Sequence, residues 1–158
     1  MAARYVLAVG ADNAGAELKN QLTAVLASDP RVEIRDYGVA DPSDPTAYPH
    51  VGLSVAEAVA SGAARRGLLV CGTGIGMAIA ANKVTGIRAT VAHDSYSVER
   101  SVLSNDCQIL TMGARVIGAE LAKKLVEEWL SLEFDPDSAS AEKLAVISEY
   151  EAEHGGEW

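Results

Sequence analysis

The chain alternates short β-rich runs with helix-like segments, and this alternation limits its possible folds more than any other feature. The β-rich runs occupy residues 5–9, 32–37, 67–71, 88–92 and 108–112. The helix-like segments occupy residues 16–27, 51–60, 75–83, 96–103 and 117–132. A last helix is expected after Ser138, with Ser140 as the residue that caps its start, and it should end near residue 150. Strands and helices that alternate at this spacing form a parallel sheet covered on both faces. We therefore predict an α/β fold, a doubly wound (Rossmann-like) three-layer sandwich with a five-stranded parallel sheet.

Length and charge narrow the class of protein. A chain of 158 residues with 49% hydrophobic content suits a single domain, 1–158, with a buried core. The net charge of −9 argues against a nucleic-acid partner. No segment reads as a signal peptide or a membrane span, so no membrane partner is expected. Two cysteines are too few for a disulfide scaffold and suit a reduced, cytoplasmic location.

The run from residue 68 to 83 carries the strongest functional signal. Cys71 ends an apolar strand and enters a loop that contains Gly72, Gly74 and Gly76, and an Ala-rich helix starts at about Ile75. Glycines let the backbone approach a ligand closely, and a helix start supplies unpaired N–H groups and the positive end of a dipole. Such a place binds anions and lowers the pKa of thiols. The run predicts acid–base chemistry beside a negatively charged group.

Polar residues follow the other predicted strands as well. Asp12 and Asn13 follow the first strand, His93 the fourth and Arg115 the fifth. Carboxyl ends of parallel strands share one edge of a sheet, so these side chains are expected near Cys71. Topology alone produces such convergence. The mixture of thiol, carboxylate, amide and glycine loop is the more specific indication.

Four segments together resemble the ribose-5-phosphate isomerase B family, which includes the galactose-6-phosphate isomerase subunits. They are residues 71–83, 86–89, 104–106 and 113–118. The resemblance extends from Val6 to about Phe134. It implies an aldose–ketose isomerase that uses no metal and no cofactor and works through a cis-enediol(ate). Its substrate would be a small sugar phosphate.

The resemblance also implies roles for individual residues. Cys71 would be the base that moves a proton between C1 and C2, with backbone N–H groups of residues 72–76 holding the enediolate oxygen. Thr73 would bond a sugar or ring oxygen. Asp12 would bind hydroxyl groups near the reacting carbons.

Three further roles follow from the same resemblance. Tyr48 would line the cleft, Arg115 would contact the phosphate, and Asn105 would come from a neighbouring subunit. The resemblance thus implies a homodimer or homotetramer with shared active sites. A C-terminal helical extension from about residue 138 would pack on that neighbour.

The departures from the family pattern bear on the substrate. Asn13 and Ser104 stand where the family usually has histidines, and the second of these histidines is credited with opening the sugar ring. Ser138 and Glu142 stand roughly where the family has two phosphate-binding arginines. Ser138, Ser140 and Lys143 at a helix start remain able to bind phosphate through hydroxyl and N–H groups.

A tetrose phosphate accounts for the missing ring-opening histidine. A pentose 5-phosphate forms a furanose, whereas a tetrose 4-phosphate cannot, because its C4 oxygen is esterified. We therefore favour D-erythrulose 4-phosphate and D-erythrose 4-phosphate as substrate and product. Three alternatives stay open: a ribose-5-phosphate isomerase in which His93 or water opens the ring, an isomerase of a non-phosphorylated sugar, and a non-catalytic sugar-phosphate-binding subunit.

Several of these residues also have plain structural interpretations. Cys107 is expected to be an inert packing residue, and His93 a surface or hydrogen-bonded histidine. Asp12 can serve simply as a cap before the first helix.

Overall fold

The five predicted strands form one parallel sheet. The computed structural model describes residues 4–155, and its strands are β1 (Tyr5–Ala11), β2 (Val32–Asp36), β3 (Arg66–Cys71), β4 (Ala89–Val91) and β5 (Ile109–Gly113). Their order is β2-β1-β3-β5-β4, with every neighbouring pair parallel. Parallel neighbours require crossover connections, and helices supply them. The predicted doubly wound α/β fold is confirmed.

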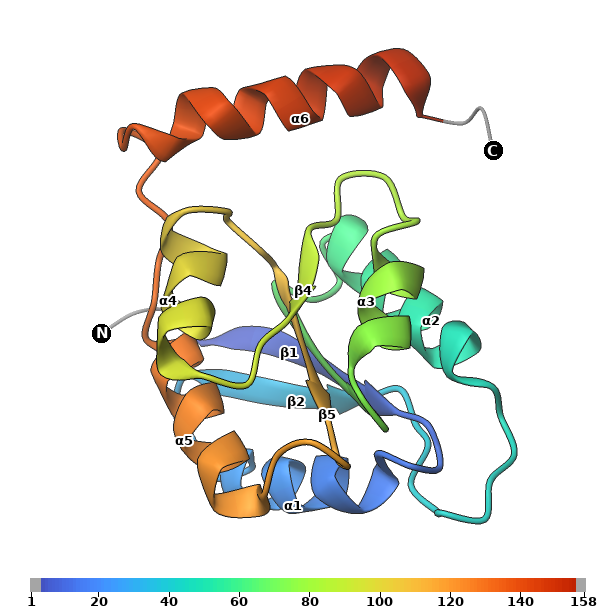
Figure 1. Cartoon of the computed structure of the whole chain (residues 1–158). Helices are drawn as coiled ribbons and strands as arrows, with labels where there is room; N and C mark the ends of the chain where they lie inside the picture. The colour runs from blue at the N-terminus through green and yellow to red at the C-terminus, as the bar shows by residue number, and fades with distance from the viewer. Residues whose placement is uncertain (1–3, 156–158) are drawn as a thin grey trace.

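Helices cover both faces of the sheet (Figure 1). They are α1 (Ala16–Leu26), α2 (Tyr48–Ala60), α3 (Ile75–Ala81), α4 (Ser95–Leu103), α5 (Ala119–Leu130) and α6 (Ser140–His154). Side chains of α1, α4 and α5 share one apolar core with the sheet, and those of α2 and α3 share the other. Helix α6 stands outside the three layers (Figure 1).

Strand β3 is the centre of both cores. All six of its residues are buried, as expected of a strand with helices on both faces. Leu68 and Val70 belong to the core under α1, α4 and α5, whereas Leu69 and Cys71 belong to the core under α2 and α3. The alternation of a strand thus directs the Cys71 thiol toward the α2–α3 face.

Two helix starts differ from the sequence prediction. Helix α2 begins at Tyr48, three residues earlier than expected, because Pro49 fits the first turn of a helix. The prediction that Ser140 caps the last helix was wrong. The N-cap is Ala139, it makes no side-chain capping bond, and Ser140 is the first helical residue.

Helix α6 lies toward the amino ends of the strands. Leu144 is its buried residue, and the Glu151 carboxylate accepts a hydrogen bond from the Gly86 N–H at 3.0 Å. Val146, Ile147 and Tyr150 are 55% to 64% exposed, so most of the apolar surface of α6 is uncovered in the single chain. None of the helices within residues 4–155 combines the length and apolar character needed to cross a membrane.

Candidate active site

The Cys71 thiol lies at the junction between β3 and the glycine loop. Its side chain is buried, and its Sγ accepts a hydrogen bond from the Gly74 N–H at 3.0 Å. Gly74 is the N-cap of α3 and has a φ of +80°. The loop therefore turns back on the thiol and gives Sγ a backbone donor.

Gly74 is required both by its dihedral angle and by crowding. A Cβ at this position would lie 2.9 Å from the Met112 carbonyl carbon and 2.9 Å from a Val91 methyl group. The Gly74 carbonyl also accepts a hydrogen bond of 2.8 Å from the buried Thr111 hydroxyl. The hydroxyl of Thr111, on β5, thus fixes the position of the loop backbone at Gly74. Sequence reasoning missed this residue, because nothing local distinguishes it from any other threonine in a strand.

Substitution of Gly74 by alanine is expected to damage both stability and activity. We expect the free energy of unfolding to fall by about 3 kcal/mol, since a left-handed residue with a Cβ costs about 1–2 kcal/mol and the clash adds to it. Gly62→Ala is the matched control, because Gly62 also has a positive φ, +79°, but open space around it. Urea denaturation and kcat would be measured for both variants. Equal destabilisation in the two would show that the contacts at Gly74 carry no weight.

The first turn of α3 offers unpaired backbone donors. The first bond of the helix runs from the Ala78 N–H to the Gly74 carbonyl, at 3.1 Å. The N–H groups of Ile75, Gly76 and Met77 therefore have no helix carbonyl to bind. The Ile75 N–H makes a long contact of 3.3 Å with the Thr73 hydroxyl. These donors stand one turn from the thiol.

Arg115 and Tyr48 flank the loop. The Arg115 N–H donates to the Gly72 carbonyl at 3.0 Å, and its guanidinium crosses Gly72 so closely that a Cβ there would lie 3.2 Å from Nη1. The Tyr48 ring packs on Gly76, where a Cβ would lie 2.6 Å from the ring. Close approach by these two side chains explains the glycines at both positions. The structure thus brings Cys71, the loop, Tyr48 and Arg115 together, as predicted.

Asp12 lies at the same edge of the sheet, but its carboxylate is hydrogen-bonded to the backbone of the turn before α1. Its N–H donates to the Val70 carbonyl at 3.3 Å, and its carboxylate accepts the Gly15 N–H at 3.0 Å. Gly15 in turn approaches β3 so closely that a Cβ would meet the Val70 carbonyl. Asp12 therefore stabilises the turn before α1, and its contact with substrate stays a prediction. Asn13 is exposed beside it.

His93 is hydrogen-bonded to the backbone and Cys107 is buried, which is compatible with a structural role for each. The His93 Nε2 accepts the Gly113 N–H at 2.8 Å, which requires that nitrogen to be unprotonated. Burial lowers the pKa of His93 and so favours the same neutral form. Burial raises the pKa of the Cys107 thiol to about 11, so this thiol stays protonated near neutral pH. Among residues 4–155 no group of three His, Cys, Asp or Glu side chains is arranged to hold a metal ion.

A second set of predicted site residues lies at the opposite edge of the sheet. Asn105 follows α4 and precedes β5, and its amide donates to the Arg100 carbonyl at 3.0 Å. Ser138, Ser140 and Lys143 lie at or just before the start of α6, where the buried Ser138 hydroxyl has no hydrogen-bond partner in the described part of the chain. A single chain does not bring these residues to Cys71.

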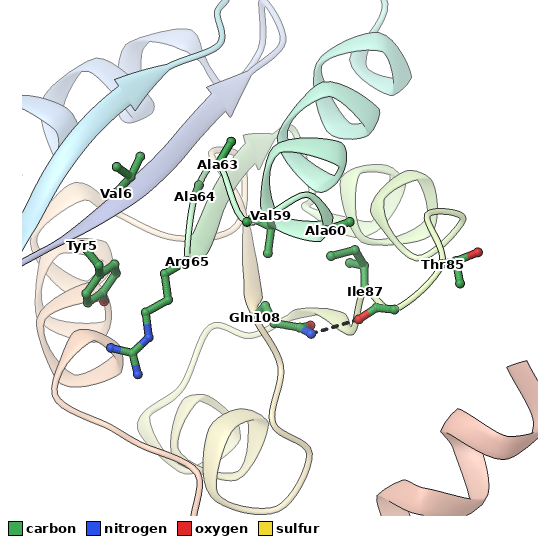
Figure 2. Close-up of a pocket in the computed structure, with 12 residues that line it drawn as sticks. Tyr5, Val6, Val59, Ala60, Ala63, Ala64, Arg65, Thr85, Ile87 and Gln108 are labelled. Carbon is green, nitrogen blue, oxygen red and sulfur yellow. Dashed lines mark hydrogen bonds between the residues drawn. The ribbon is translucent and has the colours of Figure 1, made fainter. Parts of the chain in front are cut away.

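The Cys71 loop lies on an open edge of the sheet, and within residues 4–155 the nearest of five cavities is one of about 310 Å³ that Arg115 helps to line. Cys71 does not line any of these five cavities, whose volumes are about 310 to 520 Å³. Figure 2 shows the one of about 520 Å³, between Tyr5, Arg65 and Ile87 near the amino ends of the strands. There the Gln108 amide donates to the Gly86 carbonyl at 2.9 Å. This cavity holds none of the predicted site residues.

The geometry at the Cys71 edge suits one kind of chemistry. A thiol stands beside backbone N–H donors and a guanidinium, so a proton can be moved while an adjacent oxygen carries negative charge. The doubly wound sheet places ligands at this same edge. Fold and site together favour a doubly wound α/β enzyme that works by acid–base chemistry.

Comparison with known proteins identifies the family. The sequence profile described as Ribose/Galactose Isomerase matches residues 7–147. The chain is 58% identical over 146 residues to D-erythrulose-4-phosphate isomerase 2 of Mycolicibacterium smegmatis, covering 92% of this chain and 96% of that protein. It is 45% identical over 145 residues to D-erythrulose-4-phosphate isomerase of Pectobacterium atrosepticum, covering 92% and 94%.

A solved structure agrees with the sequence matches. A ribose-5-phosphate isomerase B from Clostridium thermocellum superposes with a TM-score of 0.89 at 40% identity, covering 95% of this chain and 99% of that one. The chain therefore belongs to the ribose/galactose isomerase family, and it is an aldose–ketose isomerase.

Proposed function

We propose that this chain interconverts D-erythrulose 4-phosphate and D-erythrose 4-phosphate, with Cys71 as a metal-independent base. The observation that carries the reaction is the buried Cys71 Sγ, held by the Gly74 N–H at 3.0 Å at the mouth of a loop with unpaired N–H donors. Two relatives named for D-erythrulose 4-phosphate support the choice of substrate. The free thiols are compatible with a reducing, cytoplasmic location.

The proton transfer needs only groups at this edge. The Cys71 thiolate takes the proton from the carbon next to the carbonyl, and the electron pair moves onto the carbonyl oxygen to form an enediolate. N–H groups of the loop and of the first turn of α3 stabilise that oxygen. The Thr73 hydroxyl bonds a neighbouring sugar oxygen. The hydroxyl proton of the second carbon's oxygen passes to the enediolate oxygen as that second oxygen becomes the new carbonyl, and return of the proton from Cys71 to the other carbon completes the isomerisation.

Ser104 is the residue that favours a tetrose over a pentose. It occupies the place of a ring-opening histidine, and a tetrose 4-phosphate has no furanose ring to open. Isomerisation of ribose 5-phosphate is the second candidate, supported by the likeness to the Clostridium thermocellum enzyme.

The site is proposed to be completed by a second copy of the chain, in a homodimer or homotetramer. In the single chain Cys71 lies on an open edge, whereas Asn105 and residues 138–143 lie at the other edge. Ile75 and Ile79 on α3 are 54% and 58% exposed beside the loop, which is compatible with a covering neighbour. The C-terminal extension from about residue 138 would pack on that neighbour.

A comparison of two sugars tests the substrate. We expect kcat/KM for D-erythrose 4-phosphate to exceed that for ribose 5-phosphate by about 100-fold, since no residue is assigned to opening a ring. Initial rates would be measured with both sugars, with unphosphorylated erythrose as a control for the phosphate. Equal or faster turnover of ribose 5-phosphate would instead identify a ribose-5-phosphate isomerase.

A further inference from the structure

The Cys71 edge has little positive charge for a phosphate dianion. Arg115 is the guanidinium that the structure places at the loop. Asp12 and Asp94 follow strands β1 and β4 at the same edge, and the chain as a whole carries a net charge of −9. By the resemblance described above, Ser138 and Glu142 stand roughly where the family has two phosphate-binding arginines. Binding of the substrate's phosphate group therefore calls for a cationic side chain from outside this edge of the sheet.

Two arginines line a cavity at the opposite end of α4. This cavity of about 460 Å³ is bounded by Arg88, Arg100 and Asn105, by hydroxyl groups of β4 and α4, and by α6. No carboxylate is among the residues that line it. Arg88 and Arg100 are thus the charged groups of its lining, and each pairs with a carboxylate outside that lining, Asp106 and Glu99 respectively.

Only one of these two guanidiniums is available. The Arg88 side chain donates to the carbonyls of Asn105 and Asp106, both at 3.0 Å, and pairs with the Asp106 carboxylate at 2.9 Å. Arg88 therefore holds the loop after α4 in place.

Arg100, by contrast, is not fully engaged. Its Nε is buried without a hydrogen-bond partner within residues 4–155, although buried polar groups are normally paired. Its other contacts are a 3.2 Å bond to the Ser104 hydroxyl and a half-exposed ion pair with Glu99. Exposed pairs of this kind are weak, so an anion can replace Glu99.

Arg100, Ser104 and Asn105 form one unit. The Arg100 guanidinium touches Ser104, and the Asn105 amide bonds the Arg100 carbonyl. We propose that Arg100 binds the phosphate group of a substrate seated in the partner subunit's Cys71 site. It thus replaces the missing arginines and presents a planar fork to the phosphate oxygens. This inference rests on the proposed function, since that function places Asn105 in a neighbour's cleft.

Kinetics of Arg100→Gln test the assignment. KM for erythrose 4-phosphate is expected to rise at least tenfold while kcat changes less than threefold, because the phosphate is remote from the reacting carbons. The inhibition constant of inorganic phosphate should rise in parallel. Arg100→Lys, which keeps the charge, should recover part of the affinity. Arg35→Gln, at an exposed arginine on β2, is the control and should change neither constant. An unchanged KM and phosphate inhibition in Arg100→Gln would overturn the proposal.

Mixed oligomers test whether Arg100 acts across the interface. Cys71→Ser and Arg100→Gln chains with different tags would be co-expressed, and the mixed species purified. If Arg100 serves the partner's site, a mixed pair contains one site with both native residues, and its KM should equal that of the wild type. If Arg100 serves its own chain, no such site exists and the high KM of Arg100→Gln remains. The latter result would overturn the proposal.

A binding measurement separates this inference from the proposed activity. Inorganic phosphate should raise the Tm of the wild type and raise it less in Arg100→Gln, whether or not the chain turns over a tetrose phosphate. A wild type that is stabilised through Arg100 but inactive on both sugars would contradict only the proposed substrate. Equal stabilisation of both proteins, with normal activity, would contradict only the role of Arg100.

Discussion

Replacement of Cys71 by serine is expected to lower kcat for the tetrose phosphate about a thousandfold, with little change in KM. The barrier would rise by about 4 kcal/mol, because an alcohol is a far weaker acid than a thiol and supplies almost no base near neutral pH. The serine preserves the shape of the side chain, and its oxygen can still accept the Gly74 N–H. Steady-state rates and unfolding curves would be measured side by side to separate chemistry from stability.

Cys107→Ser is the matched control for this experiment. Cys107 is also buried, but it lies on the amino side of β5, and its pKa of about 11 keeps it protonated. We expect its kcat to stay within threefold of wild type, even if burial of a hydroxyl lowers stability by about 1 kcal/mol. A Cys71→Ser enzyme that keeps more than a tenth of its rate would exclude Cys71 as the base.

Removal of the Asp36 carboxylate should cause a large loss of stability. Lys19 on α1 is completely buried, and its ammonium donates to both Asp36 oxygens at 2.9 and 2.8 Å. Asp36→Ala leaves this charge without its partner inside the protein, at a cost of about 3 kcal/mol. For a chain of this size, Tm should fall by about 9 °C. Calorimetry and urea denaturation would measure both quantities.

The double variant Lys19→Met, Asp36→Ala is the control for Asp36→Ala, because it removes the buried charge together with its partner. Methionine fills a similar volume without a charge, so the double variant is expected within about 1 kcal/mol of wild type. Lys19 lies in α1 and Asp36 at the end of β2, and their side chains hydrogen-bond each other and the Gly38 N–H, not a predicted site residue. If the double variant is as unstable as Asp36→Ala, the loss comes from the Asp36 bond to the Gly38 N–H and not from the buried charge.

Some of this structure follows from local sequence alone. The parallel sheet was predictable because each strand and helix has its own periodicity, and the Cys71 loop because glycines and a thiol between a strand and a helix have few other uses. Helix starts were less predictable. Ser140 is a good capping residue by type, yet the chain turns at Ala139 instead, because the path before α6 is set by how the helix meets the rest of the protein.

The residues that support the site could not be identified from the sequence, for a different reason. Thr111 holds the Gly74 carbonyl from a strand 37 positions further along the chain. Gly15 approaches the end of β3 from the start of α1. Arg100 is an ordinary helix residue until its unpaired Nε and its bond to Ser104 are seen. Such contacts join segments far apart in sequence, and no local pattern records them.

The sequence by itself determined the fold class and the local form of the Cys71 loop, because both depend on short-range features: hydrophobic periodicity, and the order strand, thiol, glycines, helix. The tertiary structure alone decided which groups meet. It placed a backbone donor on Sγ, laid Arg115 and Tyr48 against the glycines, and separated Asn105 and residues 138–143 from Cys71. The parallel orientation of all five strands is the physical reason, since it puts their carboxyl ends at one edge of the sheet and their amino ends at the other.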